Sequence, residues 1–279
     1  MKAKRLVLVV LVVFVVALLT GSVSAAEYKI GHLSRLNITP EQMKSRIDAK
    51  RARGDMQIFT LGKTDDNIHI VFYDSLISMQ MALNAGEIDE IVLPEAVADY
   101  FMNVNEDYEA TGVFRGTPYS LALGFRKDDA SALLNKFNEA LRSIKADGTL
   151  AVIMDKYIAQ PGRNDPEPVK FETYDDVDTT IKAAVTGDLP PVDYIAADGT
   201  PVGFNTAILA ELAKRMKVNI ELVNIESGTR AAALASGRAD VVFWFEYHHG
   251  ANMQVDIPEG ILLSEPYYTW NEFLSLKKK

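Results

Sequence analysis

Two stretches of the chain share one pattern of apolar and polar positions. At 82–93 and again at 233–244, an apolar helical turn ends at a glycine, Gly86 or Gly237, and an apolar run opens at an aspartate three residues later. Glycine readily adopts the left-handed backbone that ends a helix, and such a run is typical of a strand buried on both faces of a parallel sheet. The repeat therefore predicts two α/β lobes of similar build, with a ligand cleft between them.

The rest of the chain alternates between strand-like and helix-like patterns. Thr39 and Gln42 have the spacing of a capping box, Ser75 can cap the helix that ends at Gly86, and Asn205 can cap a helix that runs through Met216. Strands are expected at 27–33, 68–73, 118–129, 181–185 and 219–225, an extended segment at 261–279, and further helices at 131–145, 149–158 and 205–216. These elements divide the chain into an α/β domain at 26–127, a helical pair at 128–160, a proline-rich acidic linker at 161–180, and a second α/β domain at 181–279.

Residues 1–25 have the pattern of a secretory signal peptide. A positive region with Lys2, Lys4 and Arg5 precedes an apolar run, and small residues occupy the cleavage positions at 23–25. The apolar run at 6–19 is shorter than the roughly 18–20 residues that a membrane-spanning helix needs. We therefore expect a periplasmic or secreted protein that is soluble after removal of the signal peptide, with an uncleaved anchor as the alternative.

Charge and composition exclude several classes of partner. The formal net charge is −9, and the signal segment holds cations but no acids, so the mature chain is more acidic still. Nucleic acid is not an expected partner, because a phosphate-binding surface needs excess Lys and Arg. The chain has no cysteine, so it folds without disulfides and lacks the residue on which a bacterial lipid anchor is built.

The chain shows no motif that indicates catalysis or a metal. It has no Gly-rich phosphate loop, no HExxH and no nucleophile elbow. The pair His248-His249 points in two directions on a helix or strand, and no third ligand has a diagnostic spacing. We therefore expect no metal and no cofactor, and a protein that is not an enzyme.

Many elements in a fixed order resemble one family. The segments GDLPPVDYIAADGTPVGFNTAILAELAKRM (187–216), 219–243 and 263–279 are similar to the first lobe of the bacterial extracellular solute-binding proteins of family 3, the amino-acid-binding components of ABC importers. The segments 73–101 and 118–129 resemble that family's second lobe, and 133–158 resembles its closing helices. The resemblance implies the two-lobed, type II periplasmic-binding-protein fold of class α/β.

The order of these segments differs from the family pattern. Family members run from the first lobe to the second lobe and then to closing helices that pack on the first lobe, whereas here the second-lobe-like domain and the closing helices come first. A circular permutation explains this order, with the old chain ends joined through 161–180, because chain ends at a surface tolerate such rearrangement. The alternative is an intertwined dimer in which each half pairs with the other molecule.

The resemblance implies capture of a small polar solute, an amino acid or a related compound, between two lobes, and delivery to an ABC permease in the membrane. Two alternatives stay open. One is a sensory or docking module on the same fold without a transport role. The other is an enzyme similar to periplasmic dehydratases, which needs a cleft carboxylate with a raised pKa.

The family's ligand-binding residues carry over only in part. Family members hold an amino acid's carboxylate with an arginine and helix N-terminal amides, and Arg230 matches one such position; its alternative is a solvated helix residue. The family's other arginine has no counterpart at 245–256. The aspartate that binds the ligand's ammonium aligns with Pro94, which leaves Glu95 as the nearest substitute.

Other candidates lie where the resemblance places cleft-facing groups. Asp188 and Tyr194 flank the Pro-Pro turn, and Trp244 and Glu246 end the buried strand of the second α/β domain. Trp244 can stack on a flat ligand or a cation, or it can be an ordinary core residue. Arg35 follows the first strand of the chain and can donate from the second-lobe-like domain.

Overall fold

A computed structural model describes residues 27–53, 68–127, 131–159, 168–196, 198–248 and 256–279. The predicted signal peptide at 1–25 lies outside these ranges. Among the described residues, no helix has the length and apolar character needed to cross a membrane.

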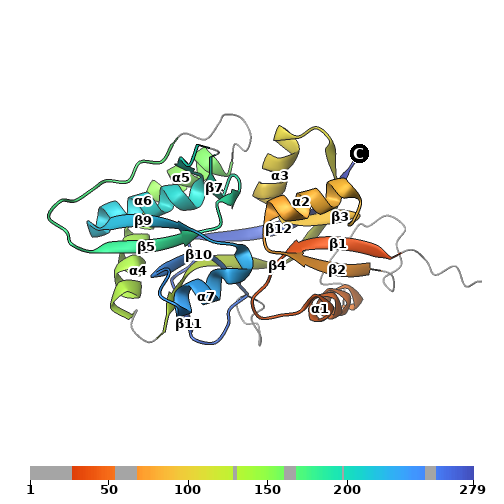
Figure 1. The fold of residues 1–279 in the computed structure, drawn as a ribbon, viewed down its shortest axis with the longest axis horizontal. Helices are drawn as coiled ribbons and strands as arrows, with labels where there is room; N and C mark the ends of the chain where they lie inside the picture. The colour runs from red at the N-terminus through yellow and green to blue at the C-terminus, as the bar shows by residue number, and fades with distance from the viewer. Residues whose placement is uncertain (1–26, 54–67, 128–130, 160–167, 197, 249–255) are drawn as a thin grey trace, which may run out of the picture.

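One mixed sheet runs the length of the molecule (Figure 1). Its strand order is β2 (Ile68–Tyr73), β1 (Tyr28–Leu33), β3 (Glu90–Pro94), β12 (Tyr268–Lys278), β4 (Tyr108–Arg126), β10 (Val241–Tyr247), β5 (Thr180–Val185) and β9 (Asn219–Asn224), with β11 (Ile261–Leu263) also paired to β4. We call the part with β1–β3 the N-terminal half and the part with β5, β9 and β10 the C-terminal half. Within each half these strands pair in parallel, and β4 and β12 run antiparallel between the halves.

Helices cover both ends of this sheet (Figure 1). The N-terminal half has α1 (Pro40–Ala52) on one face and α2 (Leu76–Ala85) and α3 (Glu95–Val104) on the other. The C-terminal half contains α6 (Phe204–Met216), the 3-10 turn η2 (Ser227–Thr229) and α7 (Arg230–Ala235), and a small sheet of β6 (Asp188–Leu189), β7 (Asp193–Ile195) and β8 (Pro201–Val202). The helices α4 (Ser131–Ala146) and α5 (Thr149–Tyr157) precede this half in sequence and pack on α6. The predicted two-lobed α/β fold is confirmed.

The repeated helix-turn-strand unit is confirmed in both halves. Gly86 and Gly237 both have φ 72°, the left-handed value that favours glycine. The aspartate that follows each glycine has the same role. Asp89 accepts a hydrogen bond from the backbone N–H of Lys29 on β1, and Asp240 accepts one from the backbone N–H of Lys182 on β5, both at 2.8 Å. Each aspartate thus fixes its buried strand against the neighbouring parallel strand.

The predicted helix starts are confirmed at α1 and α2 and wrong at α6. The Thr39 N–H donates to Gln42 Oε1, and the Gln42 N–H donates back to Thr39 Oγ1, which closes the capping box. Ser75 Oγ accepts from the Ser78 N–H at the start of α2. At α6 the N-cap is Gly203, and Asn205 is fully buried inside the helix instead of capping it.

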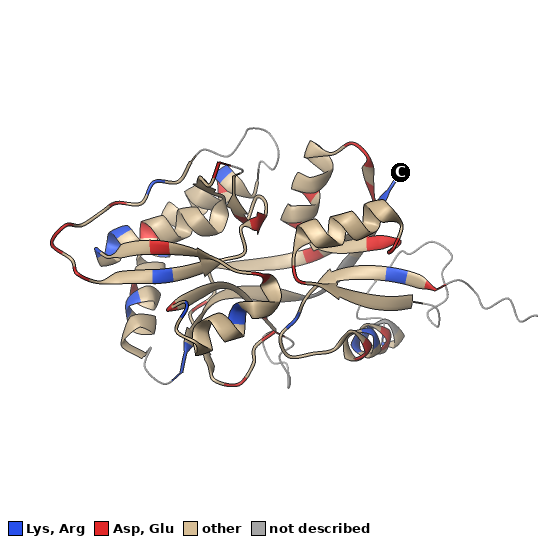
Figure 2. Ribbon diagram, in the orientation of Figure 1, with Lys and Arg blue, Asp and Glu red and all other residues tan. Residues whose placement is uncertain are grey.

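An extended segment, 168–179, lies along the C-terminal half, and Figure 2 shows acidic residues along it. The Val169 N–H donates to the Pro201 carbonyl, and the side chain of Asn219 bonds the backbone of Tyr174 and Val177. Val169 and Phe171 pack against the main hydrophobic core. This end of the predicted linker is therefore bound to the C-terminal half.

Candidate functional site

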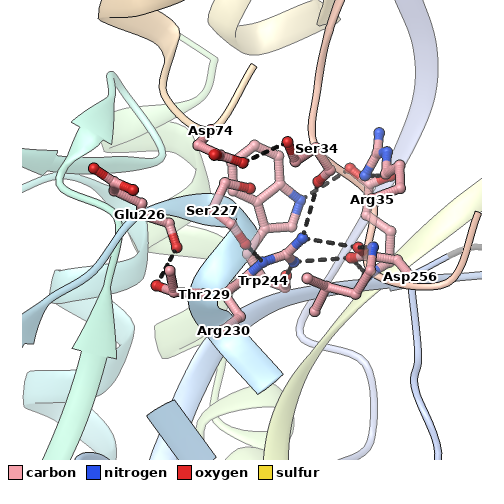
Figure 3. Close-up of polar contacts among 11 residues, drawn as sticks. Ser34, Arg35, Asp74, Glu226, Ser227, Thr229, Arg230, Trp244 and Asp256 are labelled. Carbon is pink, nitrogen blue, oxygen red and sulfur yellow. Dashed lines mark hydrogen bonds and ion pairs between the residues drawn. The ribbon is translucent and has the colours of Figure 1, made fainter. Parts of the chain in front are cut away.

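Polar side chains from both halves meet where β1 and β10 end near the sheet centre (Figure 3). Ser34 and Arg35 follow β1 in the N-terminal half. Arg230 opens α7 and Glu246 lies on β10 in the C-terminal half, and Asp256 lies between β10 and β11. Ends of parallel strands are where α/β folds bind ligands. We call these five residues with Trp244 the junction cluster.

Arg230 is the centre of the junction cluster (Figure 3). Its side chain is 1% exposed, and it forms a bidentate ion pair with Asp256, with both N–O distances 2.8 Å. Its Nε donates to the Ser227 carbonyl at 2.8 Å, its Nη1 donates to the Trp244 carbonyl, and its Nη2 donates to the Ser34 carbonyl at 3.4 Å. A guanidinium has five N–H donors, so every donor of Arg230 has an acceptor within the chain.

The Asp256 carboxylate, which is 0% exposed, is bound from both halves. Besides Arg230, its Oδ1 accepts from the backbone N–H of Leu36 at 3.3 Å, and its Oδ2 accepts from the backbone N–H of Glu246 at 3.2 Å. Leu36 belongs to the N-terminal half and Glu246 to the C-terminal half. A carboxylate held by a bidentate guanidinium and backbone N–H groups is strongly bound, so Asp256 joins the two halves.

A second ion pair crosses the same junction. Arg35 Nη1 lies 2.6 Å from Glu246 Oε2, and the Trp244 indole N–H donates to Glu246 Oε1 at 2.9 Å. Burial raises the pKa of Glu246 above its ordinary value, and the positive charge of Arg35 opposes this rise. Burial acts to lower the pKa of Arg35, but the charges of Glu246 and Asp256 outweigh it, so that this pKa is raised. The two side chains are therefore in direct contact across the junction.

The backbone of Trp244 is strained. Its φ is 66°, a left-handed value that a bulky side chain rarely adopts, and it lies in an irregular part of the pairing between β10 and β4. This conformation directs the Trp244 carbonyl to Arg230 while the indole lies in the core, 2% exposed. Strain of this kind persists only where surrounding contacts fix it, and here the guanidinium supplies one of those contacts.

A second contact between the halves lies at the start of α2. Asp188 Oδ2 accepts from the Leu76 N–H at 2.7 Å, which places a carboxylate at a helix N-terminus. Burial raises the pKa of Asp188, and the hydrogen bond from Leu76 acts against this. Nearby, the Ser227 N–H donates to the Asp74 carbonyl at 2.9 Å. The two halves are thus in direct contact at Asp188 and at Asp74 as well as through the junction cluster.

The structure brings together four of the seven residues that the sequence suggested as ligand-binding: Arg35, Arg230, Trp244 and Glu246. Asp188 lies at the α2 contact. Tyr194 is half-buried and pairs with Asp188 across β6 and β7. Glu95 opens α3 near Tyr268, whose pKa is raised to about 12 by burial and by the charge of Glu95.

Asp256 is the residue of the junction cluster that sequence reasoning missed. Residues 247–255, which precede it, have no hydrophobic periodicity and no Asp, Glu, Lys or Arg. The resemblance pointed only to an arginine, which 245–256 lacks. No local signal identifies its partner, because Arg230 is 26 positions away. Only the proximity of the guanidinium, which the fold creates, reveals its role.

His248 lies beside Tyr119, near the junction between the halves. Its ring lies 3.6 Å from that of Tyr119, and burial followed by the charge of Lys50 lowers its pKa to about 4. Among the residues that the structure describes, no group of three or more possible ligands could hold a metal ion. His249 lies outside those residues.

Comparison with known proteins found one family and many distant structures. Residues 181–278 match the family model of "Bacterial extracellular solute-binding proteins, family 3". The predicted resemblance to this family is thereby confirmed over the C-terminal half. A comparison with curated protein sequences gave no match.

Similar solved structures include three binding proteins. A ligand-binding component of an ABC-type import system from Staphylococcus aureus, with zinc bound, has 12% identity and a TM-score of 0.44; the match covers 91% of this chain and 66% of that one. The periplasmic aliphatic sulphonate-binding protein SsuA from Escherichia coli has 12% identity, a TM-score of 0.38 and the same coverages. The methionine-binding protein MetQ has 12% identity and a TM-score of 0.40, over 91% of this chain and 83% of that one.

Proposed function

We propose that this protein is a periplasmic or secreted solute-binding protein that captures a small polar solute between its two halves and delivers it to an ABC permease. An amino acid or a related compound is the proposed solute class. The mechanism is binding by closure of two halves about β4 and β12, and no bond is made or broken.

One observation carries this proposal. A buried guanidinium, Arg230, holds a carboxylate that also accepts backbone N–H groups from both halves. This arrangement provides what a carboxylate ligand needs, which is bidentate charge pairing with closure around it. The family match covers the half that supplies Arg230 and Glu246, and this supports the same conclusion.

Two other functions have weaker support. A sensory or docking module is favoured by one fact, that all donors of Arg230 are satisfied within the chain. A dehydratase-like enzyme needs a carboxylate with a raised pKa, which Glu246 has, but both oxygens of Glu246 are held by Arg35 and Trp244. Glu246 is therefore poorly placed to move a proton, and binding is the better explanation.

A thermal-shift screen of the mature protein tests the proposed function, with amino acids, polyamines and small organic acids as candidates. A true solute at a hundredfold excess over its dissociation constant stabilises the folded chain by about 2.7 kcal/mol. The shift should shrink in Arg230→Lys, because lysine cannot form the bidentate pair. Arg238→Lys, at an exposed arginine three residues beyond the end of α7, is the matched control. If no candidate shifts the melting point, or if Arg230→Lys leaves the shift unchanged, the proposal is wrong.

We further propose that both halves of one binding unit come from a single, circularly permuted chain, with 161–180 joining the old ends. The docking of 168–179 on the C-terminal half supports this. The rival, an intertwined dimer, has twice the mass. Light scattering on the mature protein as it elutes from a size-exclusion column should give the mass of a monomer. A stable dimer would favour the intertwined dimer instead.

A further inference from the structure

Asp256 occupies the position that a solute's carboxylate would take in the proposed site. It accepts four hydrogen bonds, two from Arg230 and one each from the backbone of Leu36 and Glu246. These donors come from both halves, and the carboxylate between them is completely buried. The chain thus provides its own carboxylate at the point where the halves meet.

A free carboxylate finds no unpaired donor on Arg230, the guanidinium at the centre of the junction cluster. The five N–H groups of Arg230 are satisfied within the chain, and Nη1 of the neighbouring Arg35 forms an ion pair with Glu246 at 2.6 Å. A solute with a carboxylate must therefore remove Asp256 before it can bind Arg230. A group tethered to the same chain competes at an effective concentration in the millimolar range or above, which reduces the apparent affinity of its free rival.

We infer that Asp256 is an internal ligand that holds the two halves closed and sets the specificity of the site against free carboxylates. This inference rests on the proposed function and narrows it. The preferred solutes are those whose carboxylate outcompetes this tethered one at Arg230. Removal of the Asp256 carboxylate converts the cluster into a receptor for small free carboxylates.

Chemical rescue tests this inference directly. In Asp256→Ala the lost carboxylate leaves room beside Arg230, and acetate is the probe that replaces it. We expect acetate to raise the melting point of Asp256→Ala at concentrations at least tenfold lower than any at which it affects the parent. Chloride at the same ionic strength corrects for general salt effects. Asp198→Ala, at an exposed turn aspartate, is the matched control and should respond to acetate as the parent does.

A second variant covers the case in which Asp256→Ala does not fold. Asp256→Ser also removes the carboxylate and leaves room beside Arg230, while its hydroxyl keeps one small acceptor there, so acetate should again stabilise it more than the parent. The inference is overturned if folded Asp256→Ala or Asp256→Ser responds to acetate no better than the parent.

The outcomes separate this inference from the proposed function. A parent protein that binds a carboxylate solute as tightly as Asp256→Ala does leaves the proposed function intact and removes the internal-ligand role. Acetate rescue of the variant, together with no solute for the parent in the whole screen, supports the internal ligand and removes solute capture.

Discussion

At the scale of single residues, the proposed function depends on how buried charges are paired. The sequence suggests Arg230 because it matches a ligand-contacting position of the family that the chain resembles, and the structure places it at the centre of the junction cluster. A buried guanidinium needs a partner, since an uncompensated buried charge costs several kcal/mol. The sequence indicates this need but not which carboxylate meets it, because Asp256 reaches Arg230 only through the fold.

Gly228 allows the two halves to approach closely at Asp74. A Cβ on Gly228 would lie 2.3 Å from Asp74 Oδ1. Gly228→Ala should therefore displace the Asp74 carboxylate and lower the free energy of unfolding by about 1 kcal/mol, the lower end of overpacking costs, because the tip of a side chain can move. Urea unfolding measures the loss. Adding Asp74→Ala removes the clashing atom and should recover part of the stability; equal stability of Gly228→Ala and the parent would show that the contact does not form.

His248 should make the folded protein sensitive to acid. Its pKa is lowered from 6.5 to about 4 by burial, then by Lys50, with Arg35 and Arg46 acting in the same direction. Between these values the unfolded chain binds a proton that the folded chain does not, so stability falls as the pH drops from about 6.5 to about 4. The slope from this group is at most about 1.4 kcal/mol per pH unit.

The variant His248→Gln should flatten the acid limb of the stability curve, measured by urea unfolding at stepped pH. His69→Gln, at an exposed histidine, serves as its control. An acid limb that is unchanged in His248→Gln would mean that His248 titrates normally.

At the scale of elements, local patterns predicted most of what the structure shows. The helix-turn-strand repeat, the capping box at Thr39 and the cap at Ser75 are all confirmed, because each depends on residues close in sequence. The first part of β4, from Tyr108, was missed. This part of the sequence mixes polar and apolar residues, and it forms a strand because β12 pairs along it. Pairing between distant segments is the information that a local pattern lacks.

The two repeat glycines should have equal energetic roles. Both have φ 72°; a Cβ on Gly86 would meet no atom within 4 Å, and one on Gly237 would make only an ordinary contact with Arg126. Alanine at either position should therefore cost only the left-handed strain, roughly 1–2 kcal/mol of unfolding free energy. Asparagine tolerates this backbone and should cost less at both sites. A much larger loss at one glycine than at the other would mean that the two turns are not equivalent.

At the scale of the whole molecule, the sequence predicted two α/β lobes but not their closed contact. The lobes follow from the repeat, and the antiparallel pair of β4 and β12 between them was only partly foreseen, through strand-like patterns at 118–129 and 261–279. Closure depends on Asp256, Asp74 and the α2 terminus meeting residues of the other half. None of these contacts joins residues that are close in sequence. The sequence alone could therefore suggest a cleft between the lobes, but not the side chains that join the lobes there.

The most direct test is the distance between the two halves in solution. The chain has no cysteine, so spin labels attached to Met81→Cys in α2 and Val152→Cys in α5 are the only labels on the protein and measure this distance. Both native side chains are more than half exposed. Without solute, the labelled mature protein should give one narrow distance distribution. Asp256→Ala should broaden it towards longer distances, and acetate should restore it. A broad distribution in the parent, or no change in Asp256→Ala, would contradict closure by the chain's own carboxylate.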